Sequence, residues 1–255
     1  MSHALDLRLD DLVVADAASR QAEQAFWPQD LTVLAEHHSG PDRAHSYVVA
    51  YDRSITWGLP GQPQIAAIKV ARDLVQATYT LEMAYHATVP FAQNWLIERG
   101  CPAEPISALD GDLMQPADDR TVRVEQQIRD SGTRYEVLGS WTSDFAPCET
   151  WTLTRDSDSE QAPIRLFLQE GDFDTHSYTV REGAFPDEER ARRWLDERSG
   201  PLPQPPEYRG EAAGHRARAA LRRSPGVAAL PKAGPDAHQA PSPGTAQRPG
   251  SGRSL

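Results

Sequence analysis

The stretch from Pro63 to Pro102, PQIAAIKVARDLVQATYTLEMAYHATVPFAQNWLIERGCP, is the densest run of large apolar residues and decides the predicted fold. Two apolar stripes follow helical spacing in its first half, with only a narrow polar strip beside them. The first stripe is Ile65, Ile68, Val75, Tyr79 and Met83, the second is Val70, Leu74, Leu81 and Tyr85, and the polar strip is Lys69, Asp73, Gln76 and Thr80. A helix with so little polar surface is typical of a protein core. We therefore predict a long central helix over residues 63–86.

Proline and glycine mark the ends of two further helices. Pro90 would clash with a carbonyl of the preceding turn, so a second helix is predicted over residues 90–99. Gly100 suits the left-handed residue that ends a helix. A third helix is predicted over residues 186–198, because Pro186 opens it and acids precede arginines along it, as the helix dipole favours.

The other segments read as strands joined by short polar links, which is typical of an antiparallel sheet. Strands are predicted near residues 5–9, 31–35, 46–51, 55–57, 121–127, 135–143, 150–154, 164–169 and 176–181, with a small helix over 15–26 and a loop over 103–119. The predicted fold class is α+β, with an antiparallel sheet of roughly five to eight strands covered by helices.

Composition divides the chain near residue 200. Residues 201–255 are rich in Pro, Gly, Ala and Arg and poor in large aliphatic residues, so they cannot bury enough apolar surface to order themselves. We predict a disordered basic tail there and a single folded body over residues 1–200. The chain has a net charge of −11, and because the tail is basic the body is more acidic still. An acidic body repels a phosphate backbone, so association with nucleic acid is expected only through the tail.

A short string recurs in the body. His45-Ser46-Tyr47 and His176-Ser177-Tyr178 each open a predicted strand that leads through a proline into a helix. This favours two pseudo-repeats, at about residues 1–102 and 103–200, with the helices on one face of a shared sheet. A chance identity of three residues is the alternative.

The setting is predicted to be a bacterial cytoplasm. The N-terminus carries acids where a signal peptide needs a positive region, and no run of 18 apolar residues exists in the chain. Cys101 and Cys148 are therefore expected to be reduced thiols. Lys69 and Lys232 are the only lysines among many arginines, which is typical of a GC-rich, actinobacterial genome.

The sharpest candidate for chemistry is a metal site at Asp172, Asp174 and His176. Residues at i, i+2 and i+4 of a strand point to one face, so two carboxylates and an imidazole could meet at a divalent ion. His45 or Glu82 could complete the site. The alternative is a hairpin turn at Glu170–Asp172, where Gly and Asp serve the backbone. Glu82 could also reach solvent, carry a raised pKa or pair with an arginine, and pairing is the more common outcome.

Other catalytic patterns are missing from the sequence. There is no serine nucleophile elbow and no phosphate-binding glycine loop, and neither cysteine has a basic neighbour that would activate it. The first functional hypothesis is therefore a non-catalytic binding or assembly module, without a cofactor, that binds a protein partner or itself. The alternatives are a metal-dependent hydrolase that uses Asp172, Asp174 and His176, and nucleic-acid association through the arginines of the tail.

Overall fold

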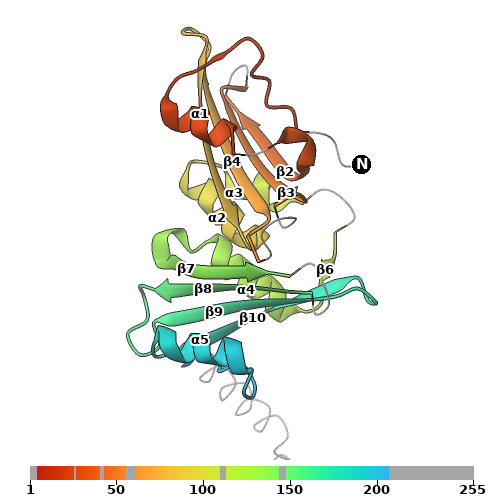
Figure 1. The fold of residues 1–255 in the computed structure, drawn as a ribbon, viewed down its shortest axis with the longest axis vertical. Helices are drawn as coiled ribbons and strands as arrows, with labels where there is room; N and C mark the ends of the chain where they lie inside the picture. The colour runs from red at the N-terminus through yellow and green to blue at the C-terminus, as the bar shows by residue number, and fades with distance from the viewer. Residues whose placement is uncertain are drawn as a thin grey trace, which may run out of the picture. The chain divides into compact units, whose positions relative to one another are not determined.

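The computed structural model describes residues 5–25, 27–40, 43–55, 61–109, 113–143 and 148–206. In this part the chain is an α+β protein with two mixed sheets of five strands and five α-helices (Figure 1). Most of the predicted disordered tail lies outside the described residues. No helix in the described part is both long enough and apolar enough to cross a membrane.

The first sheet has the order β1-β5-β4-β3-β2. Its strands are β1 (Val13–Val14), β2 (Leu31–Ser39), β3 (His45–Asp52), β4 (Ile65–Asp73) and β5 (Thr78–His86). One face packs against Leu5, Leu7 and the helix α1 (Ala17–Glu23), and the other against α2 (Val89–Glu98) and α3 (Ala103–Ser107). β1 runs parallel to β5, whereas the other neighbours are antiparallel, so the sheet is mixed and the purely antiparallel prediction is wrong.

The predicted central helix over residues 63–86 is also wrong, because this stretch is the β4–β5 hairpin. The reason is that both faces of β4 are covered, so Ala67 and Ile68 are both fully buried although they point to opposite faces. A strand buried on both faces is a continuous apolar run, and such a run also fits helical spacing. Residues that were assigned to the polar strip of the helix have other roles in the hairpin. Lys69 forms an ion pair with Glu82 on the neighbouring strand, at 3.0 Å, and Asp73 accepts a hydrogen bond in the turn that follows β4.

The second sheet has the order β6-β10-β9-β8-β7. Its strands are β6 (Gln115–Pro116), β7 (Tyr135–Thr142), β8 (Glu149–Asp156), β9 (Ile164–Asp172) and β10 (Ser177–Phe185). The helix α4 (Asp119–Arg129) packs on one face and α5 (Glu188–Glu197) on the other. The strand predicted over 121–127 is wrong, because the Asp118 carboxylate caps α4 by accepting the Thr121 N–H at 2.8 Å.

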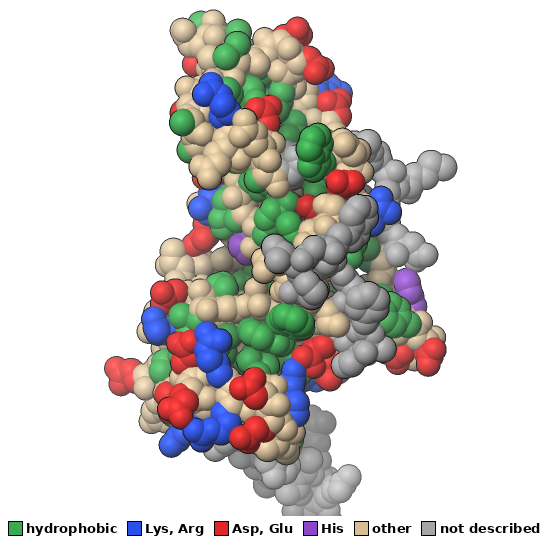
Figure 2. Space-filling view, in the orientation of Figure 1, with side chains coloured by type: hydrophobic (Ala, Val, Ile, Leu, Met, Phe, Trp, Pro, Cys, Tyr) green, Lys and Arg blue, Asp and Glu red, His purple; other side chains and the backbone are tan. Residues whose placement is uncertain are grey.

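Several other predictions are confirmed. Helices lie at α2 and α5, close to the predicted residues 90–99 and 186–198, and strands lie over residues 135–142, 164–172 and 177–185. The strand predicted over residues 5–9 is wrong, because this segment has no regular secondary structure. Residues 56 and 57 of another predicted strand lie outside the described part. Acidic and basic side chains alternate over α5 in the space-filling view (Figure 2), where Glu188–Arg192 and Glu189–Arg193 are ion pairs one helical turn apart.

Both sheets are built in the same way. Each places its short strand parallel to its last strand, through Val13–Thr78 in the first sheet and Gln115–Ser177 in the second. Each also has a register shift in its edge strand, between Val33 and Ala35 and between Val137 and Gly139. The two His-Ser-Tyr strings do not correspond, however. His45 begins β3, whereas His176 lies in the turn between β9 and β10.

Candidate anion-binding site

The predicted metal residues lie in and beside the β9–β10 turn. The Asp172 carboxylate accepts the N–H groups of Asp174, at 2.9 Å, and Thr175, at 3.3 Å. A hydrogen bond from the Thr175 side chain and these backbone N–H groups lower the pKa of Asp172. His176 has a φ of +50°, the left-handed conformation that closes the turn. The carboxylate of Asp172 therefore holds the turn.

The β4–β5 hairpin has the same turn, although Val75 and Ala77 stand there in place of Asp174 and His176. There the Asp73 carboxylate accepts the N–H groups of Val75 and Gln76, both at 3.0 Å, and Ala77 has a φ of +49°. An aspartate is thus sufficient for the backbone geometry. In the part of the chain that the structure describes, no group of three or more His, Cys, Asp or Glu side chains is arranged to hold a metal ion. The metal site remains a prediction from sequence.

The two additional candidates lie on the first sheet. His45 begins β3, and Glu82 lies on β5, where it contacts Lys69 at 3.0 Å and Arg99 at 3.2 Å. Burial raises the pKa of Glu82, but the hydrogen bonds and charges of Lys69 and Arg99 outweigh burial and lower it. The expected pairing of Glu82 with an arginine is confirmed.

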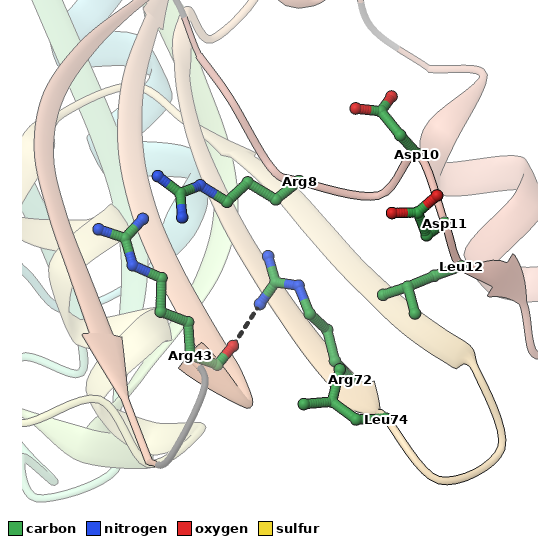
Figure 3. Close-up of a pocket in the computed structure, with 7 residues that line it drawn as sticks. All are labelled: Arg8, Asp10, Asp11, Leu12, Arg43, Arg72 and Leu74. Atoms are coloured by element: carbon green, nitrogen blue, oxygen red, sulfur yellow. Dashed lines mark hydrogen bonds between the residues drawn. The ribbon is translucent and has the colours of Figure 1, made fainter.

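A different set of residues forms a pocket of about 470 Å³ at the first sheet, and we call it the arginine pocket. Arg8, Arg43 and Arg72 lie on one side of it, and Asp10 and Asp11 lie on the other (Figure 3). Leu12 and Leu74 complete the lining. The three guanidinium groups come from the segment before β1, from the turn between β2 and β3, and from β4.

Arg72 is the fixed member of the set. Its guanidinium donates to the carbonyl of Arg43 at 2.7 Å, to Ser46 Oγ at 2.9 Å and to the carbonyl of Leu7. The N-terminal segment and the β2–β3 turn are therefore both tied to β4 through one side chain. These acceptors are neutral, so the opposing charge that acts on Arg72 comes from Asp6, whose carboxylate partly offsets the lowered pKa.

Arg8 and Arg43 reach the pocket from unusual backbone conformations. Their φ angles are +50° and +57°, in the left-handed region that non-glycine residues rarely adopt. Such strain is concentrated at binding and catalytic sites, because the surrounding structure must stabilise it. In both cases the conformation belongs to a residue whose guanidinium lines the pocket.

The electrostatics show three cations held near one another. Burial lowers the pKa of Arg72 first, and the positive charges of Arg43 and Arg8 lower it further. Burial likewise lowers the pKa of His38, with a further contribution from Arg43. The His38 ring contacts Ser46 Oγ at 2.8 Å, so the hydroxyl links the imidazole to Arg72. The side of the pocket that Arg8, Arg43 and Arg72 line is therefore positive.

Neutralisation of this charge by the protein is weak. Among the described residues the closest carboxylate to the set is Asp6, at 3.7 Å from Arg8, and both side chains of that pair are well exposed. Asp10 and Asp11 line the opposite wall and form no ion pair with the three arginines. The pocket thus keeps a cationic wall and an anionic wall apart.

The corresponding place in the second sheet is filled differently. Arg72 pairs with Tyr79 across the first hairpin, and Gly171 pairs with Tyr178 across the second. A Cβ atom on Gly171 would lie 3.2 Å from Cys148 Sγ and 3.5 Å from Met114 Sδ. Sulfur side chains therefore pack where the first sheet has a guanidinium. The charged pocket is a property of the first sheet.

Sequence reasoning missed the arginine pocket, since its members are 35 and 29 residues apart and Arg72 was assigned to a helix. One available signal was Arg8, which interrupts the alternation of Leu5, Leu7 and Leu9 with acids. Comparisons of the chain with family models, curated proteins and solved structures find no match. Its function is therefore inferred from the geometry of the site.

Proposed function

We propose that the chain is a non-catalytic binding module whose arginine pocket holds the anionic group of a small ligand. The observation that carries this proposal is the convergence of Arg8, Arg43 and Arg72, from three separate segments, on one wall of a pocket. Guanidinium groups donate several hydrogen bonds in a planar fork that matches phosphate and carboxylate oxygens. They do not release protons near neutral pH, which suits binding rather than acid–base catalysis.

An anion would relieve an energetic cost that the free pocket carries. Burial of the Arg72 guanidinium, which is the main cause of its lowered pKa, and the repulsion from Arg43 and Arg8 both oppose folding of the free protein. A phosphate or carboxylate between them replaces repulsion with charge-assisted hydrogen bonds. Binding should therefore stabilise the folded chain.

The opposite wall adds a requirement on the ligand. Asp10 and Asp11 would repel a ligand that is anionic throughout but would attract an ammonium group. A volume of about 470 Å³ lies within the range of small-molecule pockets. We therefore infer a ligand with an anionic group at one end and a cationic group at the other.

Calorimetric titration with O-phosphoethanolamine, compared with ethyl phosphate, tests the proposal. The first probe carries a phosphate and an ammonium group, and the second carries the phosphate alone. We expect saturable binding of O-phosphoethanolamine, a loss of affinity of at least tenfold in Arg43→Gln, and no change in Arg53→Gln, since Arg53 lies outside the pocket. Asp10→Asn combined with Asp11→Asn should weaken O-phosphoethanolamine alone. Absence of binding, or equal affinity in Arg43→Gln, would refute the anion site.

We also propose that the body, residues 1–200, arose by internal duplication. Residues 13–98 and 115–197 share the element order strand, helix, four strands, helix. Three contacts recur in both halves. Asp16 and Asp118 cap the first helix of each half. The hydroxyls of Ser19 and Thr121 accept the N–H groups of Leu81 and Val180, and the hydroxyls of Tyr79 and Tyr178 donate to Glu23 and Glu125. These matches favour pseudo-repeats near the predicted boundaries, about 1–102 and 103–200.

The last helix of each half supplies a sequence match. Trp95-Leu96 and Glu98-Arg99 on α2 recur as Trp194-Leu195 and Glu197-Arg198 on α5. In both helices the arginine lies over the tryptophan ring, at 3.7 Å and 5.0 Å from its centroid. A duplicated scaffold in which one copy carries the arginine pocket is consistent with a specialised binding role in the first half. Binding of a protein partner, self-association and a cytoplasmic location remain proposals of the same kind.

A further inference from the structure

A second cavity, of about 600 Å³, lies within the same compact unit and is independent of the arginine pocket. Its lining includes residues of α2, α3, α4 and both sheets. Most of its walls are apolar, with Leu34, Ile65, Val89, Pro90, Leu109, Leu113, Met114 and Pro116 among the lining residues. Apolar walls with a few polar groups are typical of sites for small molecules.

Two polar groups of this lining lack protein partners. Thr88 is only 5% exposed, and its hydroxyl forms no hydrogen bond with the described residues. It stands at the N-cap of α2 without capping the helix through its side chain. The Nε atom of Arg129, at the end of α4, is also buried without a partner. Buried polar atoms are nearly always hydrogen-bonded, so each of these groups points to a ligand.

The charges around Arg129 favour an anionic head group. Glu125 lies one turn earlier on α4 and is 9% exposed, and its carboxylate accepts the Tyr178 hydroxyl at 2.5 Å. Burial raises the pKa of Glu125, and the Tyr178 hydrogen bond and the charge of Arg129 offset part of this rise. No ion pair within 4 Å joins Arg129 to any described carboxylate. The guanidinium therefore remains available to a carboxylate from outside the chain.

Three other polar side chains of the lining are already engaged. Gln93 donates to the carbonyl of Ile106 at 2.8 Å, Ser107 to that of Ala103 at 2.6 Å, and Gln115 to that of Leu113 at 2.8 Å. Thr88 lies at the positive end of the α2 dipole, where negative charge is stabilised. Thr88 and Arg129, which carry the unpaired donors, both line this mostly apolar cavity.

We infer that this cavity binds a small carboxylic acid with an apolar body, whose carboxylate accepts hydrogen bonds from Arg129 and Thr88. The apolar body lies against the leucines, Ile65, Met114 and the prolines. Affinity comes mainly from the buried apolar surface, and the choice of a carboxylate over a neutral head group comes from Arg129.

Octanoate, with 1-octanol as its neutral counterpart, tests this inference by calorimetric titration of the full chain. We expect octanoate to bind saturably, and Arg129→Gln to lower its affinity at least tenfold while leaving that of 1-octanol within about twofold. Thr88→Val should lower octanoate affinity severalfold. Arg123→Gln is the matched control, because Arg123 is exposed on the same helix.

Two further variants keep the result decisive. Leu109→Trp, at a 39% exposed residue of the lining, should weaken both probes by filling the cavity, even if Arg129→Gln fails to fold. Arg43→Gln should leave octanoate binding intact, since it alters the arginine pocket alone. No binding at millimolar octanoate, undiminished binding to folded Arg129→Gln, or loss of binding in Arg43→Gln would each overturn the inference.

Discussion

At the scale of single residues, His86 and Phe185 occupy equivalent places at the ends of β5 and β10. Each ring lies against the tryptophan ring of the helix that follows. The ring centroids are 6.3 Å apart for His86 and Trp95 and 6.2 Å apart for Phe185 and Trp194. The Nε2 atom of His86 is buried without a hydrogen-bond partner among the described residues. Burial, with a smaller contribution from Arg99, lowers the pKa of His86 to about 4.

This lowered pKa predicts an acid-dependent loss of stability. The unfolded chain takes up a proton on His86 below pH 6.5, whereas the folded chain does so only near pH 4, so the free energy of unfolding falls as pH decreases between these values. The full loss is about 3 kcal/mol. His86→Phe, which copies the second half, should fold and remove this part of the pH dependence. Urea unfolding at pH 7, 5.5 and 4.5 measures it, and an unchanged slope would contradict the assignment.

Asp52 and Asp156 are buried aspartates at the ends of β3 and β8, and their carboxylates accept hydrogen bonds from different donors. Asp52 accepts the Tyr85 hydroxyl at 2.7 Å. Asp156 instead accepts from Arg134 at 2.7 Å and from Arg165 at 2.9 Å. The Arg165 side chain is 1% exposed, and the Asp156 side chain is fully buried.

Arg165→Met should therefore be strongly destabilising, because it removes one of the two guanidinium partners of a buried carboxylate. Removing a partner of a buried ion pair typically costs about 3–5 kcal/mol. Arg155→Gln is the control, since Arg155 is half exposed and pairs with an exposed Glu136. Its effect should stay within about 1 kcal/mol. Urea unfolding compares the two variants, and similar losses would show that burial of the cluster contributes little.

The chemistry of these residues was only partly predictable from sequence. The pairing of Glu82 could be anticipated, because a carboxylate on a mostly apolar element needs a cation. The arginine pocket could not, because its members meet only after β4 pairs with β3 and the N-terminal segment packs beside them. The role of Asp172 in holding the β9–β10 turn was likewise not specified by the metal-site prediction, which stays a prediction.

At the scale of elements, the β4–β5 and β9–β10 hairpins show why helical spacing misled and why turn chemistry was informative. Helices α2 and α5 were predictable, because the residues that begin and end them, such as proline, acids and a terminal glycine or arginine, act through neighbouring residues of the chain. The strand character of residues 65–86 depends on burial of both faces, which is decided by distant partners. The turn predicted at residues 170–172 lies further along the chain, since these residues end β9 and the turn covers residues 173–176. Asp172 still holds that turn by accepting backbone N–H groups.

Ala77 closes the first of these turns with a φ of +49°, a conformation that costs energy for a residue with a Cβ atom. Ala77→Gly should therefore raise the free energy of unfolding by about 0.5–1 kcal/mol. Val75→Gly, in the same turn but without a positive φ, should lower it. Thermal unfolding of the two variants measures the difference, and stabilisation by both or by neither would contradict the strain.

At the scale of the whole chain, two sheets of one design carry different side chains at equivalent places. Arg72 corresponds to Gly171, and the charge of the first position is replaced by sulfur side chains at the second. The sequence prediction of two pseudo-repeats rested on the His-Ser-Tyr string, which does not correspond between the two sheets. The informative match was the Trp-Leu and Glu-Arg pairs of α2 and α5, which are separated by a constant offset.

The most direct test of the account is an NMR titration of the isotope-labelled full chain with O-phosphoethanolamine. The proposed pocket predicts saturable shifts of the arginine Nε–H signals of Arg8, Arg43 and Arg72 and of the neighbouring amides in residues 7–12, 43–46 and 70–74. Signals of residues 115–197 should stay unchanged, because the second half lacks the arginines. Saturable shifts centred in the second half, or no saturable shift at all, would contradict the arginine pocket as the binding site.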